Sequence, residues 1–435
     1  MLPPAVRTAV AALRDRPIAA TEKGFGVIAA RQTVTSASLG TGRPSLFGPV
    51  FTTPVLVLRE SAVAHNIAAM TSYCTAAGVS LAPHGKTTMA PQLLARQLEA
   101  GAWAVTAATI SQVQVYRAFG IPRILLANEL TDPAGIGWLA DEMAADPGFE
   151  CYLYVDSAAG VQLLDTSLRT RGARRPLPVL VELGYPGGRT GCRDIGEAVA
   201  VAGAVAAAPT LRIAGAAGYE GGIGHDREVP TLEAISRYCR SLHRLGEQLA
   251  AAATPGRMIL SAGGSAFFDV VVRELAGGWA GSEPPAVVLR SGVYVAFDHG
   301  LYAGIAPGGT GETGQLPPGP LFEPALELWA HVVSRPEPEL ALACAGRRDV
   351  SFDAGMPDPL RFRQAGGRLV TAAGSHVSAL DDQHAYLRLP GGTDLAPGDL
   401  VSLGVSHPCT TFDKWRVIPV VDDDYHVVDA IHTFF

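Results

Sequence analysis

The stretch Val79-Ser-Leu-Ala-Pro-His-Gly-Lys-Thr-Thr-Met89 sets the pattern from which the fold of this 435-residue chain can be predicted. Its apolar start breaks at Pro83 and Gly85, which is typical of a buried strand that ends in a turn. The turn carries Lys86, and the only other lysines among the 34 basic residues are Lys23 and Lys414. Arginine stays protonated at biological pH, whereas a desolvated lysine amine can lose its proton and attack a carbonyl. The setting of Lys86 therefore indicates a Schiff-base lysine at a strand end.

This first run opens a regular alternation of short aliphatic runs and longer helical stretches. The eight runs are Ser80–Lys86, Ala104–Thr109, Ile124–Glu129, Cys151–Ser157, Pro178–Gly184, Leu211–Gly218, Arg257–Gly263 and Ala286–Gly292. The helical segments between them include Ala90–Ala100, Ser111–Phe119, Pro133–Ala145, Ile195–Ala207 and Leu232–Ala253. Eight strands, each followed by a crossover, predict an α/β fold with a parallel (β/α)8 barrel of the TIM type. The alternative, an open doubly wound sheet, usually carries Gly-x-Gly-x-x-Gly after its first strand, and this chain does not.

The alternation stops at Ala306–Pro320, a stretch rich in glycine and proline that indicates a loop or linker. Short alternating runs follow without long helices, at Ala325–Val333, Arg368–Ala373, Tyr386–Leu389, Leu400–Val405 and Arg416–Val421. We therefore predict a barrel over residues 53–305 and a β-rich C-terminal domain over residues 306–435. Residues 1–52 form an N-terminal extension that we expect to pack with the β domain. The strand-like runs Gly24–Ile28 and Thr53–Arg59 are candidates to join its sheet.

Composition excludes several other classes of protein. With 48% hydrophobic and 17% charged residues, the chain has the composition of a packed globular protein. Its net charge of −7 argues against nucleic-acid binding, which needs a basic surface. No apolar run reaches the roughly 18 residues of a membrane span, and the N-terminus lacks a secretory pattern. The six cysteines are scattered, as expected for reduced thiols. We expect a cytoplasmic protein with metabolic function, not a membrane protein.

Two glycine-bearing turns after the last two barrel runs are candidates for a phosphate site. They are Gly263-Gly-Ser265 and Ser291-Gly-Val-Tyr294, which offer backbone N–H groups, hydroxyls and a phenol. The loops after strands 7 and 8 are the usual phosphate site of such barrels. A phosphate site opposite a Schiff-base lysine is the minimal description of a site for pyridoxal 5'-phosphate.

Other candidates are less specific when each is considered alone. Arg189 could bind a phenolic oxygen or a carboxylate, or be one solvated loop arginine among many. Tyr219 could pack against a flat ring or be a structural tyrosine. His407 and Cys409, two residues apart, could present an imidazole and a thiolate to one zinc ion, with water and substrate in the remaining positions. His376 and His384 lie upstream and could add a ligand or an acid/base group.

Taken in order, these motifs resemble the D-serine dehydratase and D-threonine aldolase group of fold-type III pyridoxal-phosphate enzymes, relatives of alanine racemase. The motifs that carry the resemblance are Pro83-His-Gly-Lys-Thr-Thr88, Gly188-Arg-Thr-Gly191, Gly218-Tyr-Glu-Gly221, Gly263-Gly-Ser265, Ser291-Gly-Val-Tyr294 and His407-Pro-Cys409. The resemblance runs from about Thr53 to the C-terminus. It implies that Lys86 forms the Schiff base and that Arg189 and Tyr219 contact the cofactor.

The same resemblance extends to the phosphate, metal and acid/base positions. It implies that Gly263, Gly264, Ser265, Ser291, Gly292 and Tyr294 bind phosphate and that His407 and Cys409 bind zinc. A catalytic role is expected for His384, although the Glu-His-Gly of the family appears here as Gln383-His384-Ala385. Dehydratases of the group carry His-x-Cys, whereas its aldolases tend to carry His-x-Asp. Because a thiolate favours zinc, Cys409 favours dehydration.

We therefore expect a homodimeric lyase that converts a D-3-hydroxy amino acid, such as D-serine or D-threonine, to a 2-oxo acid and ammonia. Retro-aldol cleavage to glycine and an aldehyde is the nearest alternative. A noncatalytic pyridoxal-phosphate carrier is a further one, but a carrier needs neither the β domain nor the His-x-Cys pair. A racemase would need a second base on the opposite face, which the sequence does not identify.

Overall fold

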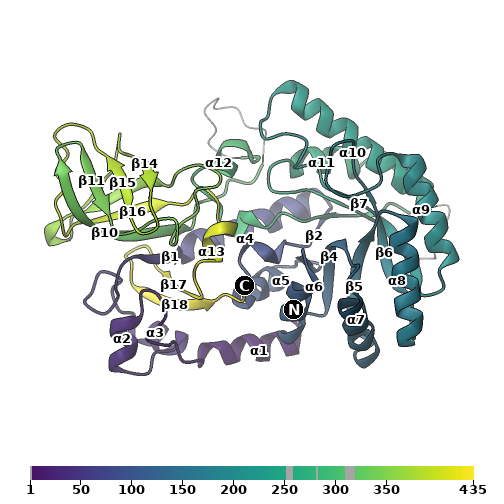
Figure 1. Ribbon diagram of the computed structural model, residues 1–435, viewed down its shortest axis with the longest axis horizontal. Helices are drawn as coiled ribbons and strands as arrows, with labels where there is room; N and C mark the ends of the chain where they lie inside the picture. Colours follow the sequence, from purple (N-terminus) through teal and green to yellow (C-terminus); the bar gives the residue numbers. More distant parts are fainter. Residues whose placement is uncertain (1, 251–257, 281–282, 309–318) are drawn as a thin grey trace.

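The computed structural model describes residues 2–250, 258–280, 283–308 and 319–435 (Figure 1). A parallel sheet wrapped by helices lies on one side, and an antiparallel sheet lies on the other. The N-terminal helices run beneath the antiparallel sheet in this view. Among the described residues, no helix combines the length and the hydropathy that crossing a bilayer requires.

The parallel sheet is the predicted barrel. Its strands within the described residues are β2 (Ser80–Leu81), β3 (Val105–Ala107), β4 (Arg123–Glu129), β5 (Glu150–Val155), β6 (Leu177–Leu183), β7 (Leu211–Gly218), β8 (Ile259–Ala262) and β9 (Ala286–Leu289). They are ordered β2-β9-β8-β7-β6-β5-β4-β3. A bridge between His84, which follows β2, and Thr106 of β3 joins the two ends of this order and closes the barrel. Each of the eight predicted runs overlaps one of these strands, although β4, β5 and β6 begin one residue earlier, so the predicted fold is confirmed. Arg257, at the start of one run, lies outside the described residues.

Helix α4 (Glu60–Ala76) precedes the first barrel strand. Each of the first seven barrel strands is then followed by a helix, as predicted: α5 (Pro91–Glu99), α6 (Ile110–Ala118), α7 (Pro133–Ala145), α8 (Ala158–Arg171), α9 (Ile195–Ala207), α10 (Val229–Ala250) and α11 (Phe268–Leu275). Side chains cap several N-termini: Asp132 accepts hydrogen bonds from two backbone N–H groups of α7, and Asp194 accepts one from α9. The predicted helix Leu232–Ala253 begins earlier, at Val229, and its last three residues lie outside the described residues.

The second sheet has the order β13-β12-β16-β10-β1-β17-β18. Its strands are β1 (Val55–Arg59), β10 (Leu326–Glu337), β12 (Asp358–Arg363), β13 (Leu369–Thr371), β16 (Leu400–Gly404), β17 (Val417–Val421) and β18 (Val427–His432), with β11 (Leu340–Ala343), β14 (His376–Leu380) and β15 (Ala385–Arg388) attached through β10. The predicted run Thr53–Arg59 does join this sheet, since β1 pairs with β10 and β17. Of the predicted linker Ala306–Pro320, residues 309–318 lie outside the described residues.

The N-terminal extension is helical, with α1 (Pro4–Arg14), α2 (Gly26–Arg31) and α3 (Ser36–Gly42). The predicted strand at Gly24–Ile28 is therefore wrong. Phe25 and Ile28 are both buried and pack with Trp329 of the antiparallel sheet. A spacing of three residues places two side chains on one side of a helical turn, and a run of five apolar residues is too short to reveal this period. The division of the chain at residues 52/53 and 305/306 stays a prediction.

Lys23 ties the extension to a loop of the second sheet. Its ammonium donates to Asp349 Oδ1 at 2.9 Å and to the Arg348 carbonyl at 2.8 Å. It also lies 4.7 Å from the centre of the Trp415 ring, whose N–H donates to the Asp349 carbonyl. Asp349 is buried, so Lys23 compensates the charge of a carboxylate that water does not reach.

Candidate active site

A cavity of about 360 Å³ lies at the carboxyl ends of the barrel strands, where the antiparallel sheet adjoins the barrel. This volume is within the range of roughly 300–1,000 Å³ that small-molecule sites occupy. The cavity is lined by His84, Lys86, Thr87, Ala108, Ala127, Asn128, Tyr154, Glu182, Arg189, Thr190, Tyr219, Gly264, Ser265, Arg290, Gly292, Val293, Tyr302, His407 and Cys409. One surface therefore brings together side chains from both halves of the chain.

Lys86 lies in the short helix η1 (Gly85–Thr87), directly after β2. Its side chain lines the cavity and stays exposed to it, while the surrounding protein atoms partly desolvate the amine. This desolvation lowers the pKa of Lys86, and the nearby charges of Arg189 and Arg290 lower it further, against the opposing effect of Cys409. A lowered pKa increases the fraction of neutral amine, the form that can attack a carbonyl or accept a proton.

His84 and Arg189 also line the cavity. Burial lowers the pKa of His84 well below its usual value, and the charges of Lys86 and Arg290 act in the same direction, so this imidazole is neutral. The Arg189 guanidinium lies 4.8 Å from the centre of the Tyr219 ring. The predicted arginine and tyrosine thus lie together on one wall, although they come from different loops.

The two glycine turns reach the cavity only in part. Gly264, Ser265 and Gly292 line it, whereas Gly263 and Ser291 do not. The backbone N–H groups of Gly263 and Gly264 both donate to the buried Glu220 carboxylate, and the Ser291 hydroxyl donates to the Gly263 carbonyl. The predicted use of these glycine N–H groups for phosphate therefore needs correction, because a side chain already occupies them.

Two other predicted residues do not reach the cavity. Tyr294 is fully buried, and its hydroxyl accepts a hydrogen bond from Gln97 at 2.8 Å. His384 is exposed in the turn between β14 and β15 and lies outside the cavity lining of this chain. The predictions of Tyr294 as a phosphate ligand and of His384 as a catalytic group are therefore not supported by the geometry of one chain.

His407 and Cys409 do line the cavity, and Cys409 contacts the residue that follows Lys86. Asp353 Oδ2 lies 2.7 Å from His407 Nδ1, and the Cys409 thiol donates to Thr87 Oγ1 at 3.5 Å. Hydrogen bonding to Cys409, and then to Asp353, raises the pKa of His407 to about 9 against the effect of burial. Asp353 faces one ring nitrogen, and the other ring nitrogen lies beside the Cys409 sulfur. This nitrogen and sulfur together are a donor set typical of zinc.

Sequence reasoning missed Arg290, a buried cation at the base of the cavity. It follows β9 and donates to Ser261 Oγ at 2.7 Å and to the Gly218 carbonyl at 2.5 Å. Its guanidinium lies 5.8 Å from the centre of the Tyr154 ring. The signal available in the sequence was an arginine that directly follows a run of buried aliphatic residues, where a charge is expensive unless it is paired.

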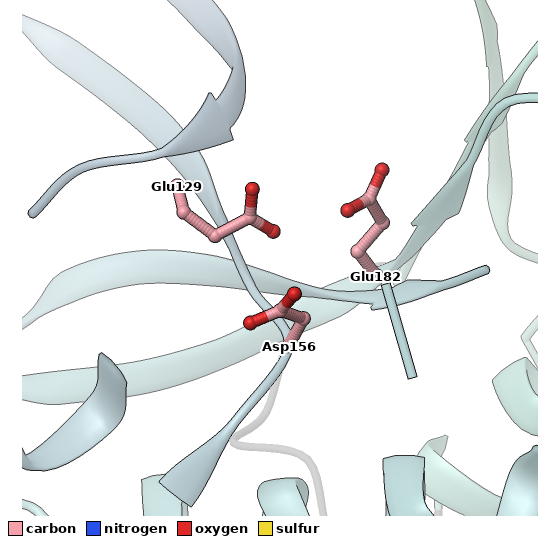
Figure 2. Close-up of side chains that lie close together, drawn as sticks. All are labelled: Glu129, Asp156 and Glu182. Carbon is pink, nitrogen blue, oxygen red and sulfur yellow. The ribbon is translucent and has the colours of Figure 1, made fainter. Parts of the chain in front are cut away.

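A cluster of three carboxyl groups lies at the ends of β4, β5 and β6, one of them in the cavity wall (Figure 2). Glu129, Asp156 and Glu182 each offer an oxygen within 4.8 Å of the others. Burial, followed by the adjacent Glu182, raises the pKa of Glu129 to about 8, and burial also raises that of Glu182. A proton shared between Glu129 and Glu182 satisfies both groups at neutral pH.

Several known proteins are similar to this chain in sequence. A family model described as a putative serine dehydratase domain matches residues 325–421. D-threonine aldolase of Arthrobacter sp is 28% identical over 374 residues, covering 85% of this chain and 89% of the relative. 3-Hydroxy-D-aspartate aldolase of Paracoccus denitrificans is 27% identical over 365 residues, covering 80% and 84%.

Solved structures support the same fold. D-threonine aldolase from Filomicrobium marinum has a TM-score of 0.71 at 24% identity, covering 88% of this chain and 95% of that one. D-threo-3-hydroxyaspartate dehydratase from Delftia sp. HT23 has a TM-score of 0.68 at 21% identity, covering 88% and 97%. The fold and the relatives define this chain as an enzyme of the lyase class with an alanine racemase-like fold. It is a relative of the D-threonine and D-3-hydroxyaspartate aldolases, and the predicted resemblance is confirmed.

Proposed function

We propose that this enzyme is a pyridoxal-phosphate-dependent lyase of D-3-hydroxy amino acids, with Lys86 as the Schiff-base residue. The observation that carries the proposal is a desolvated lysine amine that lines the same cavity as a histidine–cysteine pair. The residues present fit the cofactor. Arg189 and Tyr219 form a flat wall, and no hydrogen bond within the described residues uses the backbone N–H or hydroxyl of Ser265.

The bound cofactor supplies an electron sink that makes the substrate α-carbon acidic. The chain itself supplies the base, because the amine of Lys86, once released, lies where it can accept the α-proton. Desolvation, and then the charges of Arg189 and Arg290, lower the pKa of Lys86 and favour the neutral amine that accepts this proton. Burial lowers the pKa of His84, which makes its imidazole a weak base beside this amine. Substrate carboxylate binding suits Arg189, whose guanidinium faces the cavity.

We further propose that His407 and Cys409 hold zinc. Zinc bound there would act as a Lewis acid on the 3-hydroxyl group of the substrate. Asp353 fixes the His407 ring, and the soft sulfur of Cys409 selects zinc over harder cations. Loss of the α-proton and of the 3-hydroxyl as hydroxide would give an enamino acid, and its hydrolysis by water would yield the 2-oxo acid and ammonia.

Retro-aldol cleavage is the second candidate, and the curated relatives named above, which are aldolases, favour it. It uses the same groups but removes the proton of the 3-hydroxyl instead of expelling hydroxide. D-threonine separates the two outcomes, because dehydration gives 2-oxobutanoate and ammonia, whereas cleavage gives glycine and acetaldehyde.

The test combines product analysis with two matched lysine variants. Lys86→Ala should abolish turnover and the visible absorbance of the lysine-bound cofactor, whereas Lys414→Ala, at the other side of the metal pair in sequence, should retain both. Cys409→Asp should exchange zinc for a harder cation and move the products towards glycine and acetaldehyde. Unchanged absorbance in Lys86→Ala would refute the assignment of the lysine.

A further inference from the structure

We propose that Glu220 is a positioning residue that holds the Gly263-Gly264-Ser265 turn as the subsite for the phosphate of the cofactor. This inference rests on the proposed function, since it concerns how the same cavity takes its cofactor. Glu220 follows β7, and its side chain reaches the turn that follows β8, the neighbouring strand of the barrel.

The contacts of Glu220 are specific and entirely internal. Its Oε2 accepts a hydrogen bond from the Gly263 N–H at 3.0 Å, and its Oε1 accepts one from the Gly264 N–H at 2.7 Å. The residue has no measurable exposure to solvent. A buried carboxylate group loses the hydrogen bonds that water would give it, and these two N–H groups replace them.

These contacts divide the donors of the turn into two sets. The N–H groups of Gly263 and Gly264 point to Glu220 and are unavailable to a ligand. The N–H and hydroxyl of Ser265, which lines the cavity, have no hydrogen-bond partner among the described residues. Because Gly263 and Gly264 are held by Glu220, they fix the orientation of the Ser265 N–H and hydroxyl towards the cavity.

The conformation of the turn agrees with this reading. Gly263 has φ of +89°, in the left-handed region that favours glycine. A Cβ at Gly264 would lie 2.9 Å from Tyr219 Cε2, so the turn packs directly against the ring that stacks with Arg189. Glu220 thus fixes the phosphate end of the cavity relative to the wall for the ring.

A change of Glu220 should affect the phosphate subsite and spare the rest of the cavity. In Glu220→Gln one accepting oxygen becomes an NH2 donor that opposes a backbone N–H, so one anchor is lost. Pyridoxal lacks the phosphate but shares the ring and the aldehyde. We expect the dissociation constant for pyridoxal 5'-phosphate to rise at least about tenfold in the variant, and that for pyridoxal to stay within about threefold.

Asp399 offers a matched control. It is also buried, and its two oxygens accept hydrogen bonds from the N–H groups of Ala365 and Ala396, but it does not line the cavity. Asp399→Asn should leave both dissociation constants unchanged. The measurement is titration of cofactor-free full-length protein with each vitamer, followed by absorbance, with circular dichroism to report folding.

A second variant, Glu220→Asp, retains the charge but is one methylene too short to reach both N–H groups, and it should show the same selective loss. Equal weakening of both vitamers, no weakening, or loss of the native circular dichroism in both Glu220 variants would overturn the inference. If the unaltered protein binds neither vitamer, the proposed function itself fails.

Discussion

Replacement of Glu129 by glutamine should stabilise this protein at alkaline pH, which is unusual for loss of an active-site charge. Glu129 lies beside Glu182 and Asp156, so at high pH three carboxylates repel one another in a poorly hydrated place (Figure 2). One oxygen each of Glu129 and Glu182 is buried without a hydrogen-bond partner. A glutamine amide is uncharged and can donate a hydrogen bond to Glu182 at any pH.

The magnitude follows from the pKa of Glu129, which rises from 4.5 to about 8. Between these values the folded protein binds the proton and the unfolded chain does not, so the free energy of unfolding falls as pH rises through this window. The full difference corresponds to about 5 kcal/mol, at roughly 1.4 kcal/mol for each pH unit. Because Glu129 is partly accessible to water, we expect about half, near 2–3 kcal/mol.

The assay is urea denaturation at pH 5 and pH 8, followed by circular dichroism. Glu129→Gln should match the unaltered protein within about 1 kcal/mol at pH 5 and exceed its free energy of unfolding by about 2–3 kcal/mol at pH 8. Glu339→Gln, on an exposed residue, serves as the control and should show no such dependence on pH. A variant that is less stable at pH 8, or that differs equally at both values, would refute a shared proton in this cluster.

Two further predictions concern the second sheet. Lys23→Met should lower the free energy of unfolding by about 1–2 kcal/mol, because it removes the cation from the buried Asp349 and from the Trp415 ring. As a control, Lys414→Met loses only a 3.9 Å contact to Asp413 and should change the free energy of unfolding by less than about 0.5 kcal/mol in the same denaturation experiment. Asp353→Ala should weaken zinc binding by about tenfold or more, measured by competition with a chromogenic chelator, because the His407 ring loses the group that orients it; unchanged affinity would mean that the ring needs no such support.

The fold could be predicted from the sequence because its signal is repeated. Eight apolar runs alternate with helical stretches, so an error at the boundary of one strand does not change the prediction of a barrel. The run Gly24–Ile28 had no such support, and tertiary packing of Phe25 and Ile28 against Trp329 decided its conformation. Local pattern is weakest where a short segment is shaped by distant residues.

The site could be predicted to the level of which strand ends meet, but not to the direction of each side chain. Lys86, Arg189 and Cys409 reach the cavity, whereas Tyr294 follows the same turn as Gly292 but points into the core towards Gln97. The role of Glu220 was hidden for a related reason. Whether a backbone N–H faces a ligand or a side chain depends on a residue more than forty positions away.

The place of β1 in the antiparallel sheet has a consequence for how this chain is made. β1 ends at Arg59, but its neighbours β10 and β17 begin at Leu326 and Val417. On a ribosome the strand emerges long before either partner, so an apolar segment with both edges unpaired must persist while the whole barrel is synthesised. The last strands to appear complete a sheet that the first sixty residues began. A cut after the barrel would leave β1 with the barrel fragment, and the sheet fragment would lack one of its interior strands.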